Sequence, residues 1–301
     1  MGLYEPNPET TKERKQTMAN ILDGKLLSQT IRQELSKESK AFEQLHGRVP
    51  GLAVLLIGEN PASKIYVRNK KKACEDCGFY SEVLEFPKDV RQEEIAETIC
   101  RLNGDDRIDG ILIQLPLPDH IDKAALINII DPQKDVDAFH SLNVGRLFIG
   151  QYLWAPCTPA GVMEMLHRAG ISVAGKKCVV VGRSNLVGKP MGQLLLQENG
   201  TVTLCHSKTA DLKKECLEAD ILVVAVGHPH LITADMVKQG AVVVDVGIDR
   251  DAEGKLCGDV DFERVKEKAS YISPVPGGVG PMTVTMLMKN TLLAAENRCK
   301  E

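Results

Sequence analysis

The chain has 301 residues, of which 43% are hydrophobic and 26% charged, and its net charge is −4. This length allows a large core and is more typical of two domains than of one. The slightly acidic balance argues against nucleic acid as the main partner. No apolar run approaches the roughly 18 residues of a membrane-spanning helix. We therefore expect a globular protein that binds neither nucleic acid nor membranes.

The N-terminal segment and the cysteines indicate in which cellular compartment the protein is expected. Residues 1–15 are polar and lack the apolar stretch of a secretory signal, and residues 1–17 are predicted to form a disordered extension. The nine cysteines are scattered, mostly within apolar patterns, as buried thiols are in a reducing compartment. Cys74 and Cys77 form one C-x-x-C motif without a second pair, so zinc is not favoured. We expect a cytoplasmic protein without a metal.

Strand and helix patterns alternate along the first half of the chain. Strands are predicted at 52–58, 80–86 and 110–114, and helices at 63–77, 92–103 and 122–130. Two prolines within 115–118 end the third strand. A loop through residues 135–137 follows, and this first domain is expected to span 18–158.

The second half contains four short apolar strands about twenty residues apart, which is typical of a doubly wound sheet. The strands are predicted at 177–181, 201–205, 221–225 and 241–246, with helices at 161–169, 190–198, 211–217 and 233–238. A last helix at 282–298 is expected to pack back on the first domain, as part of a returning segment 282–301. The predicted fold class is α/β, with two α/β domains. The C-terminal one, 159–281, is a Rossmann-type dinucleotide-binding domain, and an active-site cleft lies between the two.

The turn after the strand at 177–181 is the strongest sign of a nucleotide site. The strand ends at Gly182 and a helix pattern follows, which is the geometry that aims backbone N–H groups at a phosphate. The three-glycine fingerprint is broken, because Ser184 and Val187 occupy the second and third glycine positions. Arg183 adds a cation in the same turn.

The residues that follow the next three strands indicate which dinucleotide binds. The strand at 201–205 is followed by His-Ser-Lys-Thr, without the acid that holds the ribose 2′-hydroxyl in an NAD enzyme. Arg183 and Ser207 instead suit a 2′-phosphate, so NADP is favoured over NAD. Glycines at the ends of the last two strands, Gly227 and Gly247, would let a flat ring approach the backbone.

A second group of residues could carry chemistry. Tyr66 and Lys70 are spaced to share one face of a helix, where a phenol ring and an ammonium could stack on and protonate a ligand. The run Lys70-Lys71-Lys72 is equally typical of a solvated surface. Gln114 ends a strand and points either at a ligand or at loop backbone. Asp135 and Asp137 could bind a ligand or cap turns.

Taken together, these segments resemble one family, the bifunctional methylenetetrahydrofolate dehydrogenase/cyclohydrolases. The resemblance extends in family order from about Ile21 to the C-terminus. It is carried by YVRNK at 66–70, GILIQLPLP at 110–118, KDVD at 134–137, PCTP at 156–159, VGRS at 181–184, VGKP at 187–190, CHSKT at 205–209 and the Pro- and Gly-rich loop 274–283. Ala138 stands where many members have glycine.

The resemblance implies roles for these residues. Lys70 would be the catalytic lysine, tuned by Gln114, with Tyr66 stacking on the folate and Asp137 anchoring its pterin. The folate would also contact Leu115, Pro274 and Gly278. NADP would be held by Thr158, Gly182, Arg183, Ser184, Val187, Ser207, Gly227, Ile248 and Thr283. The family's habit also implies a homodimer and a tetrahydrofolate derivative as substrate.

Two other functions are weighed against this one. A monofunctional NAD-dependent dehydrogenase is disfavoured by the missing acid near Ser207 and by the presence of both Lys70 and Gln114. A non-catalytic cofactor-binding module is disfavoured by the same intact residues together with Tyr66.

Overall fold

The structure is a computed structural model and describes residues 18–300, so the predicted extension at 1–17 lies outside the described residues. The helices are α1 (Gly24–His46), α2 (Pro61–Cys77), α3 (Gln92–Asn103), α4 (Lys123–Ile127), α5 (Ser141–Phe148), α6 (Cys157–Arg168), α7 (Gly188–Gln197), α8 (Leu212–Leu217), α9 (Phe262–Val265) and α10 (Val279–Arg298), with a 3-10 turn, η1, at Ala234–Met236. The strands are β1 (Asn20–Ile21), β2 (Gly51–Ile57), β3 (Tyr80–Phe86), β4 (Gly110–Ile113), β5 (Lys177–Val181), β6 (Thr201–Cys205), β7 (Ile221–Val224), β8 (Val242–Asp245), β9 (Asp249–Arg250), β10 (Leu256–Cys257) and β11 (Tyr271–Ile272).

The first half forms a three-stranded parallel sheet in the order β3-β2-β4. Every residue of β2 is buried, because helices cover both faces of the central strand. Alternate side chains serve two different cores. Val54 and Leu56 belong to the core shared with α1, α2 and α10, whereas Leu55 and Ile57 pack with the apolar residues of α3 and α4.

The second half forms a six-stranded parallel sheet in the order β1-β11-β8-β7-β5-β6. β5 lies between β6 and β7, so the chain reverses its direction of winding at that strand. In open α/β sheets, ligands bind at such a switch point, beyond the carboxyl ends of the strands. The order of strands therefore brings the turn after β5 together with the ends of β6 and β7.

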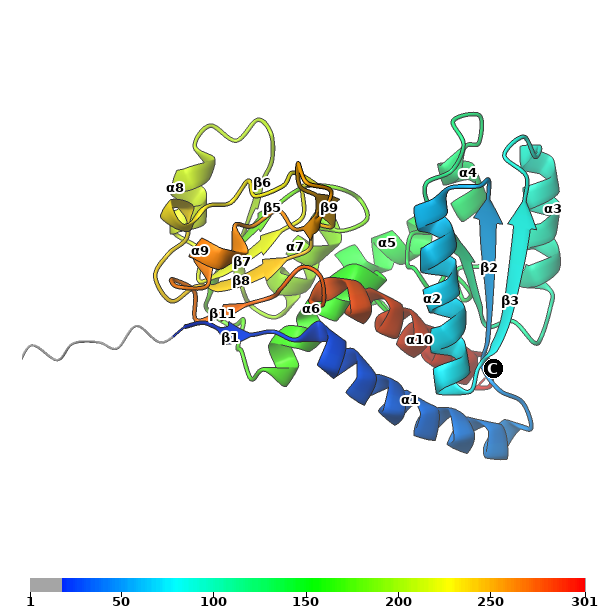
Figure 1. The fold of residues 1–301 in the computed structure, drawn as a ribbon. Coiled ribbons are helices and arrows are strands. Elements are labelled where there is room, and N and C mark those ends of the chain that lie inside the picture. The colour runs from blue at the N-terminus through cyan, green and yellow to red at the C-terminus, as the bar shows by residue number, and fades with distance from the viewer. Residues whose placement is uncertain (1–17, 301) are drawn as a thin grey trace, which may run out of the picture.

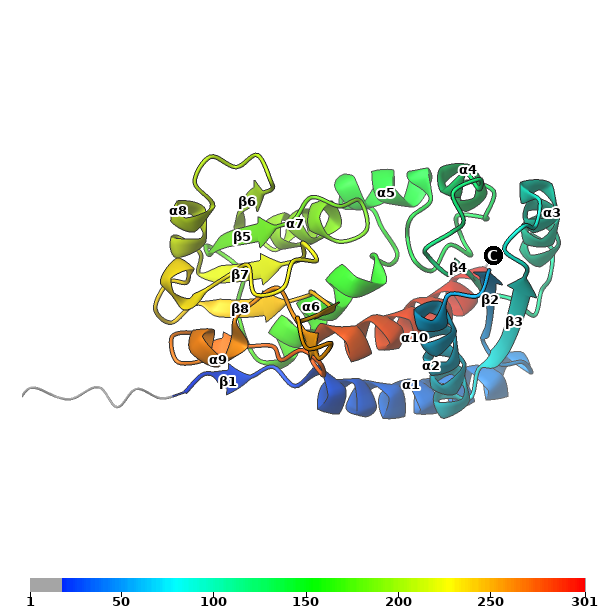
Figure 2. The same ribbon diagram turned by 45° about the horizontal axis from the view of Figure 1, so that its top comes forward.

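Helices α1 and α10 run side by side from the large sheet to the small one (Figures 1 and 2). α10 is buried along most of its length and packs on α1, α2 and α6. The sequence patterns did not reveal α1. Its apolar face, which includes Ile31, Leu35 and Phe42, is interrupted by the buried serines Ser28 and Ser39. Asp23 caps its first turn, and Gly47 ends it in the left-handed conformation.

A buried carboxylate stabilises the junction of α10 with the small sheet. Asp109, which is completely buried, accepts hydrogen bonds from Arg48 at 2.7 and 2.9 Å and from Arg298 at 2.8 Å. It also accepts the N–H group of Gly51 at 3.0 Å. The two arginines and the backbone N–H satisfy an otherwise costly buried charge.

The predicted α/β fold class with parallel sheets is confirmed, and several element predictions are corrected. The helix expected at 122–130 is only the short α4, and that expected at 233–238 is only the turn η1. The helix predicted from 161 begins at Cys157. The helix predicted from 63 begins at Pro61, because Asn60 caps it and proline is favoured at the first helical position. α5, α9 and the β9–β10 hairpin were not predicted.

Within residues 18–300, no helix is long and apolar enough to cross a membrane.

Candidate active site

Lys70 and Gln114, 44 residues apart in the chain, are hydrogen-bonded to each other. α2 carries Lys70, and Gln114 directly follows β4. The Lys70 Nζ atom donates to Gln114 Oε1 at 2.8 Å, and Gln114 Nε2 donates to the carbonyl oxygen of Leu115 at 2.7 Å. The second bond fixes the orientation of the amide, so that its oxygen and not its nitrogen faces the lysine. Gln114 thus satisfies loop backbone, one of the two alternatives that the sequence left open, and also contacts the Lys70 side chain.

The surroundings of Lys70 favour its neutral form. Burial lowers the pKa of the Lys70 ammonium, and the nearby Asp137 carboxylate partly opposes this shift. Burial likewise raises the pKa of Asp137, which Lys70 and a hydrogen bond with Cys157 oppose. A lysine with a lowered pKa can act as a proton acceptor or donor closer to neutral pH than an exposed one.

The segment that carries Asp137 is held from several sides. Asp135 is buried and accepts hydrogen bonds from the His140 backbone and from Asn143, both at 2.8 to 2.9 Å, so it has the turn-capping role rather than a ligand-binding one. Asn290 of α10 donates to the carbonyl oxygens of Val136 at 2.8 Å and of Ala155 at 3.0 Å.

The residue after Asp137 is alanine, where many members of the family have glycine. Ala138 has a φ of +58°, in the left-handed region that glycine adopts most readily. The loop therefore keeps, with alanine, the backbone conformation that a glycine would allow at lower cost.

Tyr66 lies one helical turn before Lys70 and is 39% exposed, which leaves its ring accessible to a ligand. Cys157, which the sequence analysis assigned no role, is buried at the start of α6 and donates to the Val136 carbonyl oxygen at 3.5 Å. Its position inside the PCTP block was the only signal that could have singled it out.

The start of α6 also joins the lysine site to the second domain. Thr158, next to Cys157, is hydrogen-bonded to Thr283 of α10 at 3.0 Å. Ile248, in the loop after β8, is half-exposed and approaches Gly280 at the start of α10. Pro274 and Gly278 lie in the segment between β11 and α10, where Gly278 packs closely on the start of α1. The structure thus links Asp137 and Cys157, beside Lys70, through Thr158 to Thr283 at the start of α10.

The turn after β5 has the close backbone approaches of a dinucleotide site. Gly182 has a φ of +127°, and a Cβ atom there would lie 2.3 Å from the Ala225 carbonyl oxygen. A Cβ atom on Gly188 would lie 2.2 Å from the Gly182 carbonyl oxygen. Gly188, one residue beyond Val187, therefore allows the close packing of helix on strand that the third glycine of the fingerprint provides. A side chain at either position would clash with this backbone, so the tight turn between β5 and α7 requires glycine at both.

The polar groups around this turn suit an additional phosphate. Ser184 Oγ accepts the N–H groups of Val187 at 3.1 Å and Gly188 at 3.3 Å, which leaves its own O–H free to donate. Arg183 and Ser207 are exposed at the ends of β5 and β6. Gly227 follows β7 with a φ of +66°. The residues present therefore fit a dinucleotide that carries a 2′-phosphate.

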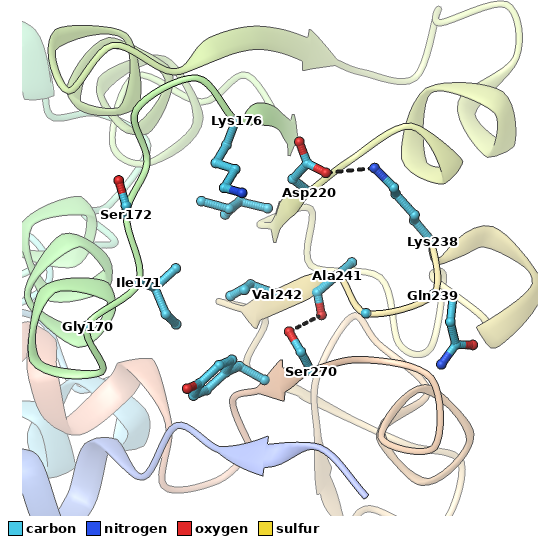
Figure 3. A pocket seen from close by; sticks show the side chains of 13 residues that line it. Gly170, Ile171, Ser172, Lys176, Asp220, Lys238, Gln239, Ala241, Val242 and Ser270 are labelled. Carbon is cyan, nitrogen blue, oxygen red and sulfur yellow. Dashed lines mark hydrogen bonds and ion pairs between the residues drawn. The ribbon is translucent and has the colours of Figure 1, made fainter. Parts of the chain in front are cut away.

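Other reactive groups lie outside this junction. Burial raises the pKa of Cys74 to about 12 and of Cys77 to about 11, so neither thiol is poised to react. In residues 18–300 no cluster of metal-ligating side chains is present. A cavity of about 410 Å³ opens at the amino ends of β7, β8 and β11, between Lys176, Lys238 and Tyr271 (Figure 3). It includes no predicted site residue.

The fold and these two groups of residues define a two-domain α/β protein that binds a dinucleotide next to a lysine site. Comparison with known proteins identifies the family. The tetrahydrofolate dehydrogenase/cyclohydrolase catalytic domain matches residues 22–137, and the NAD(P)-binding domain of the same family matches residues 156–299. The chain is 54% identical over 279 residues to the bifunctional protein FolD of Bacillus anthracis, covering 93% of this chain and 97% of that protein.

Solved structures agree with this match. The bifunctional FolD methylenetetrahydrofolate dehydrogenase/cyclohydrolase of Campylobacter jejuni superposes with a TM-score of 0.90 at 49% identity, covering 93% of this chain and 99% of the other. The dehydrogenase-cyclohydrolase of Trypanosoma brucei, solved with NADP cofactor and an inhibitor, has a TM-score of 0.91 at 40% identity, covering 95% and 100%. This chain belongs to the tetrahydrofolate dehydrogenase/cyclohydrolase family, as its sequence motifs predicted.

Proposed function

We propose that this protein oxidises 5,10-methylenetetrahydrofolate to 5,10-methenyltetrahydrofolate with NADP and then hydrolyses the product to 10-formyltetrahydrofolate at the same site. The observation that carries this proposal is the Lys70–Gln114 hydrogen bond beside Asp137, adjacent to the Thr158–Thr283 contact that leads into the dinucleotide domain. Both the catalytic domain and the NAD(P)-binding domain of the family match this chain.

For the oxidation, the chain supplies orientation. NADP, when bound, provides the nicotinamide C4 that accepts the hydride. The folate nitrogens stabilise the cation left on the one-carbon unit, so no strong acid or base is needed. Gly182, Arg183, Ser184, Val187 and Ser207 are proposed to hold the phosphates. Thr158, Gly227, Ile248 and Thr283 are proposed to border the nicotinamide.

For the hydrolysis, Lys70 supplies proton transfer. Its lowered pKa increases the fraction of neutral amine near neutral pH, and that amine can take a proton from the water that attacks the methenyl carbon. The resulting ammonium can then give a proton to N5 as the bond between N5 and the one-carbon unit breaks, which leaves the formyl group on N10. Gln114 keeps the Nζ atom in place throughout. The proposed folate contacts are Tyr66, which stacks on the aromatic ring, Asp137, which accepts from the pterin edge, and Leu115, Pro274 and Gly278, which line the site.

The test is a pair of spectrophotometric assays on one preparation. Methylenetetrahydrofolate is supplied with NADP⁺ or NAD⁺ to measure oxidation, and methenyltetrahydrofolate is supplied alone to measure hydrolysis. We expect both activities, with NADP⁺ preferred. Oxidation with NAD⁺ alone and no hydrolysis would identify the monofunctional dehydrogenase, and neither activity would identify a non-catalytic module.

A substitution separates the two steps. Lys70→Met should abolish hydrolysis more completely than oxidation, because only hydrolysis requires proton transfer by the lysine. Full cyclohydrolase turnover by this variant would refute the assigned role. Lys72→Met is the matched control, because Lys72 is an exposed lysine on the same helix with no assigned role, and both activities should stay near those of wild type.

We further propose that the protein is a cytoplasmic homodimer. In the described part of the chain all nine cysteines are free thiols, which suits a reducing compartment. β6 is an edge strand, and exposed apolar side chains surround it: Leu204 on β6, Leu196 on α7, and Phe148 and Ile149 at the end of α5. An unpaired edge next to an apolar patch suits a second copy of the chain. Sedimentation velocity of wild type and Leu204→Glu tests this proposal.

The division into an N-terminal folate domain at 18–158 and an NADP domain at 159–281, with 282–301 returning to the first, stays a proposal. α10 packs on α1 and α2, which supports the return. β1, however, pairs with β11 in the large sheet, so the chain begins in one unit and continues in the other.

A further inference from the structure

Two buried carboxylates organise the loops that follow β7 and β8. Asp259 is 0% exposed and Asp245 is 3% exposed. A buried carboxylate is costly unless hydrogen bonds satisfy it. Each of these two accepts three backbone N–H groups, and neither forms part of the lysine site. Their hydrogen bonds are directed at the loops that border the proposed cofactor.

Asp259 holds the loop at residues 226–228. Its Oδ2 atom accepts the N–H groups of Val226 at 2.7 Å and Gly227 at 3.3 Å, and its Oδ1 atom accepts that of His228 at 2.7 Å. All three loop residues are exposed on their other side. Because their N–H groups are occupied and the His228 carbonyl oxygen accepts the Leu231 N–H group at 3.3 Å, the backbone of this loop offers a ligand the carbonyl oxygens of Val226 and Gly227, which are hydrogen-bond acceptors.

Asp245 fixes Asp259 in turn. Its carboxylate accepts the N–H groups of Asp259 at 3.1 Å and of Val260 and Gly247 at 2.9 Å each. A Cβ atom on Gly258 would lie 2.0 Å from Asp245 Oδ2, so only glycine allows this approach. The ends of β7 and β8 and the segment before α9 are thereby joined into one hydrogen-bonded unit.

A third carboxyl group, that of Asp249, lies against Asp259. Burial and the negative charge of Asp259 raise the pKa of Asp249, while the nearby His228 opposes the shift. Within the described residues, Asp249 Oδ2 is buried without a hydrogen-bond partner.

The position of this unit indicates what it does. With the 2′-phosphate held by Arg183 and Ser207, as proposed above, the nicotinamide end of NADP would reach the carboxyl ends of β7 and β8. A nicotinamide ring carries a carboxamide, whose NH₂ group donates hydrogen bonds. The backbone carbonyl oxygens at 226 and 227 would be complementary to that end of the cofactor.

Resting on the proposed function, we propose that Asp259 is a positioning residue for the nicotinamide. It holds the loop at 226–228 so that the backbone carbonyl oxygens of Val226 and Gly227 can accept from the carboxamide. Asp259 does not touch the reacting atoms. It acts through the backbone of Val226, Gly227 and His228.

The main test is Asp259→Asn, an isosteric change that removes the charge and places N–H donors against the loop's own N–H groups. NADPH binding is measured by fluorescence titration without folate. We expect the dissociation constant to rise at least about tenfold, and amide hydrogen exchange of residues 226–228 to accelerate. Hydrolysis of methenyltetrahydrofolate, which uses no NADP, should stay within about twofold of wild type. NADPH affinity within about twofold of wild type, with unchanged exchange, would overturn the proposal.

Asp220→Asn is the matched control. Asp220 lies in the same domain at the opposite edge of the sheet, where it accepts the Lys177 N–H group at 2.9 Å and pairs with Lys238 at 2.6 Å (Figure 3). Losing these contacts disturbs the domain without touching the loop at 226–228. An equal loss of NADPH affinity in this variant would show that general loosening of the domain, and not the loop, is responsible.

A measurement on the wild type keeps the proposal testable even if Asp259→Asn does not fold. NADPH should slow amide hydrogen exchange of residues 226–228, because the bound carboxamide orders this loop further. Unchanged exchange of these residues in saturating NADPH would overturn the proposal. If wild type binds NADPH but oxidises no folate, the proposed function fails, while the binding comparison remains valid.

Discussion

Replacing Gly182 by alanine should separate the two activities of this protein. The new Cβ atom would lie 2.3 Å from the Ala225 carbonyl oxygen, at a backbone φ of +127° that alanine rarely adopts. The carbonyl would have to retreat by roughly 1 Å to restore ordinary contact. Such overpacking costs about 1 to 3 kcal/mol, and the backbone strain costs a similar amount.

Part of this strain should weaken cofactor binding, because Gly182 and Ala225 directly follow the adjacent strands β5 and β7 at the switch point. If about 2 kcal/mol falls on NADP⁺ binding, the KM for NADP⁺ rises roughly thirtyfold. The assay compares the KM for NADP⁺ in oxidation with the rate of methenyltetrahydrofolate hydrolysis. We expect the first to rise and the second to stay near that of wild type.

Gly240→Ala provides the control for backbone strain alone. Gly240 has a φ of +79° with nothing within 4 Å of its Cβ position, and it lies before β8, at the opposite edge of the sheet. This variant should lower the melting temperature without changing the KM for NADP⁺. The reasoning is wrong if Gly182→Ala changes that KM less than about threefold, or if Gly240→Ala changes it equally.

Three further substitutions test other parts of the argument. Ser207→Glu should lower kcat/KM for NADP⁺ by about tenfold or more and improve that for NAD⁺, because a carboxylate repels a 2′-phosphate and binds a 2′-hydroxyl; an unchanged NADP⁺ to NAD⁺ ratio would contradict this. Asp109→Ala should lower the free energy of unfolding in urea by about 2 to 4 kcal/mol, since it leaves two half-buried arginines without their carboxylate; a loss below about 1 kcal/mol would count against the role given to Asp109. Asp137 raises the pKa of Lys70, so Asp137→Asn should lower that pKa and move the acidic limb of the cyclohydrolase kcat profile to lower pH; a move to higher pH would show that the sign is wrong.

The sequence predicted best the features that depend on neighbouring residues. The strands of the small sheet and β5 to β8 of the large one follow from short apolar runs, whereas the two-residue strands β1 and β11 were not predicted. The turn at Gly182 follows from one glycine after four apolar residues. The pairing of Lys70 with Gln114 was available only through the family resemblance, because no local pattern joins residues 44 positions apart.

What the sequence did not predict depends on partners distant in the chain. α1 completes its interrupted apolar face only against α10. Asn290 supports the Asp137 loop from more than 150 residues away. Asp245 ends a run of valines and has the pattern of a strand end, although its carboxylate holds the backbone of Asp259 and Val260. Such roles follow from tertiary contacts, which hydrophobic periodicity does not encode.

The crossing of the two chain ends has a consequence for folding. β1 adds the outer strand to the sheet of the second unit, and α10 returns from that unit into the core of the first. A fragment cut near residue 158 would expose the edge of β11, and the other fragment would lack the helix that covers its sheet. Neither unit is complete without a segment from the far end of the chain. We therefore expect the whole protein to unfold in a single cooperative transition, with no stable half-folded intermediate.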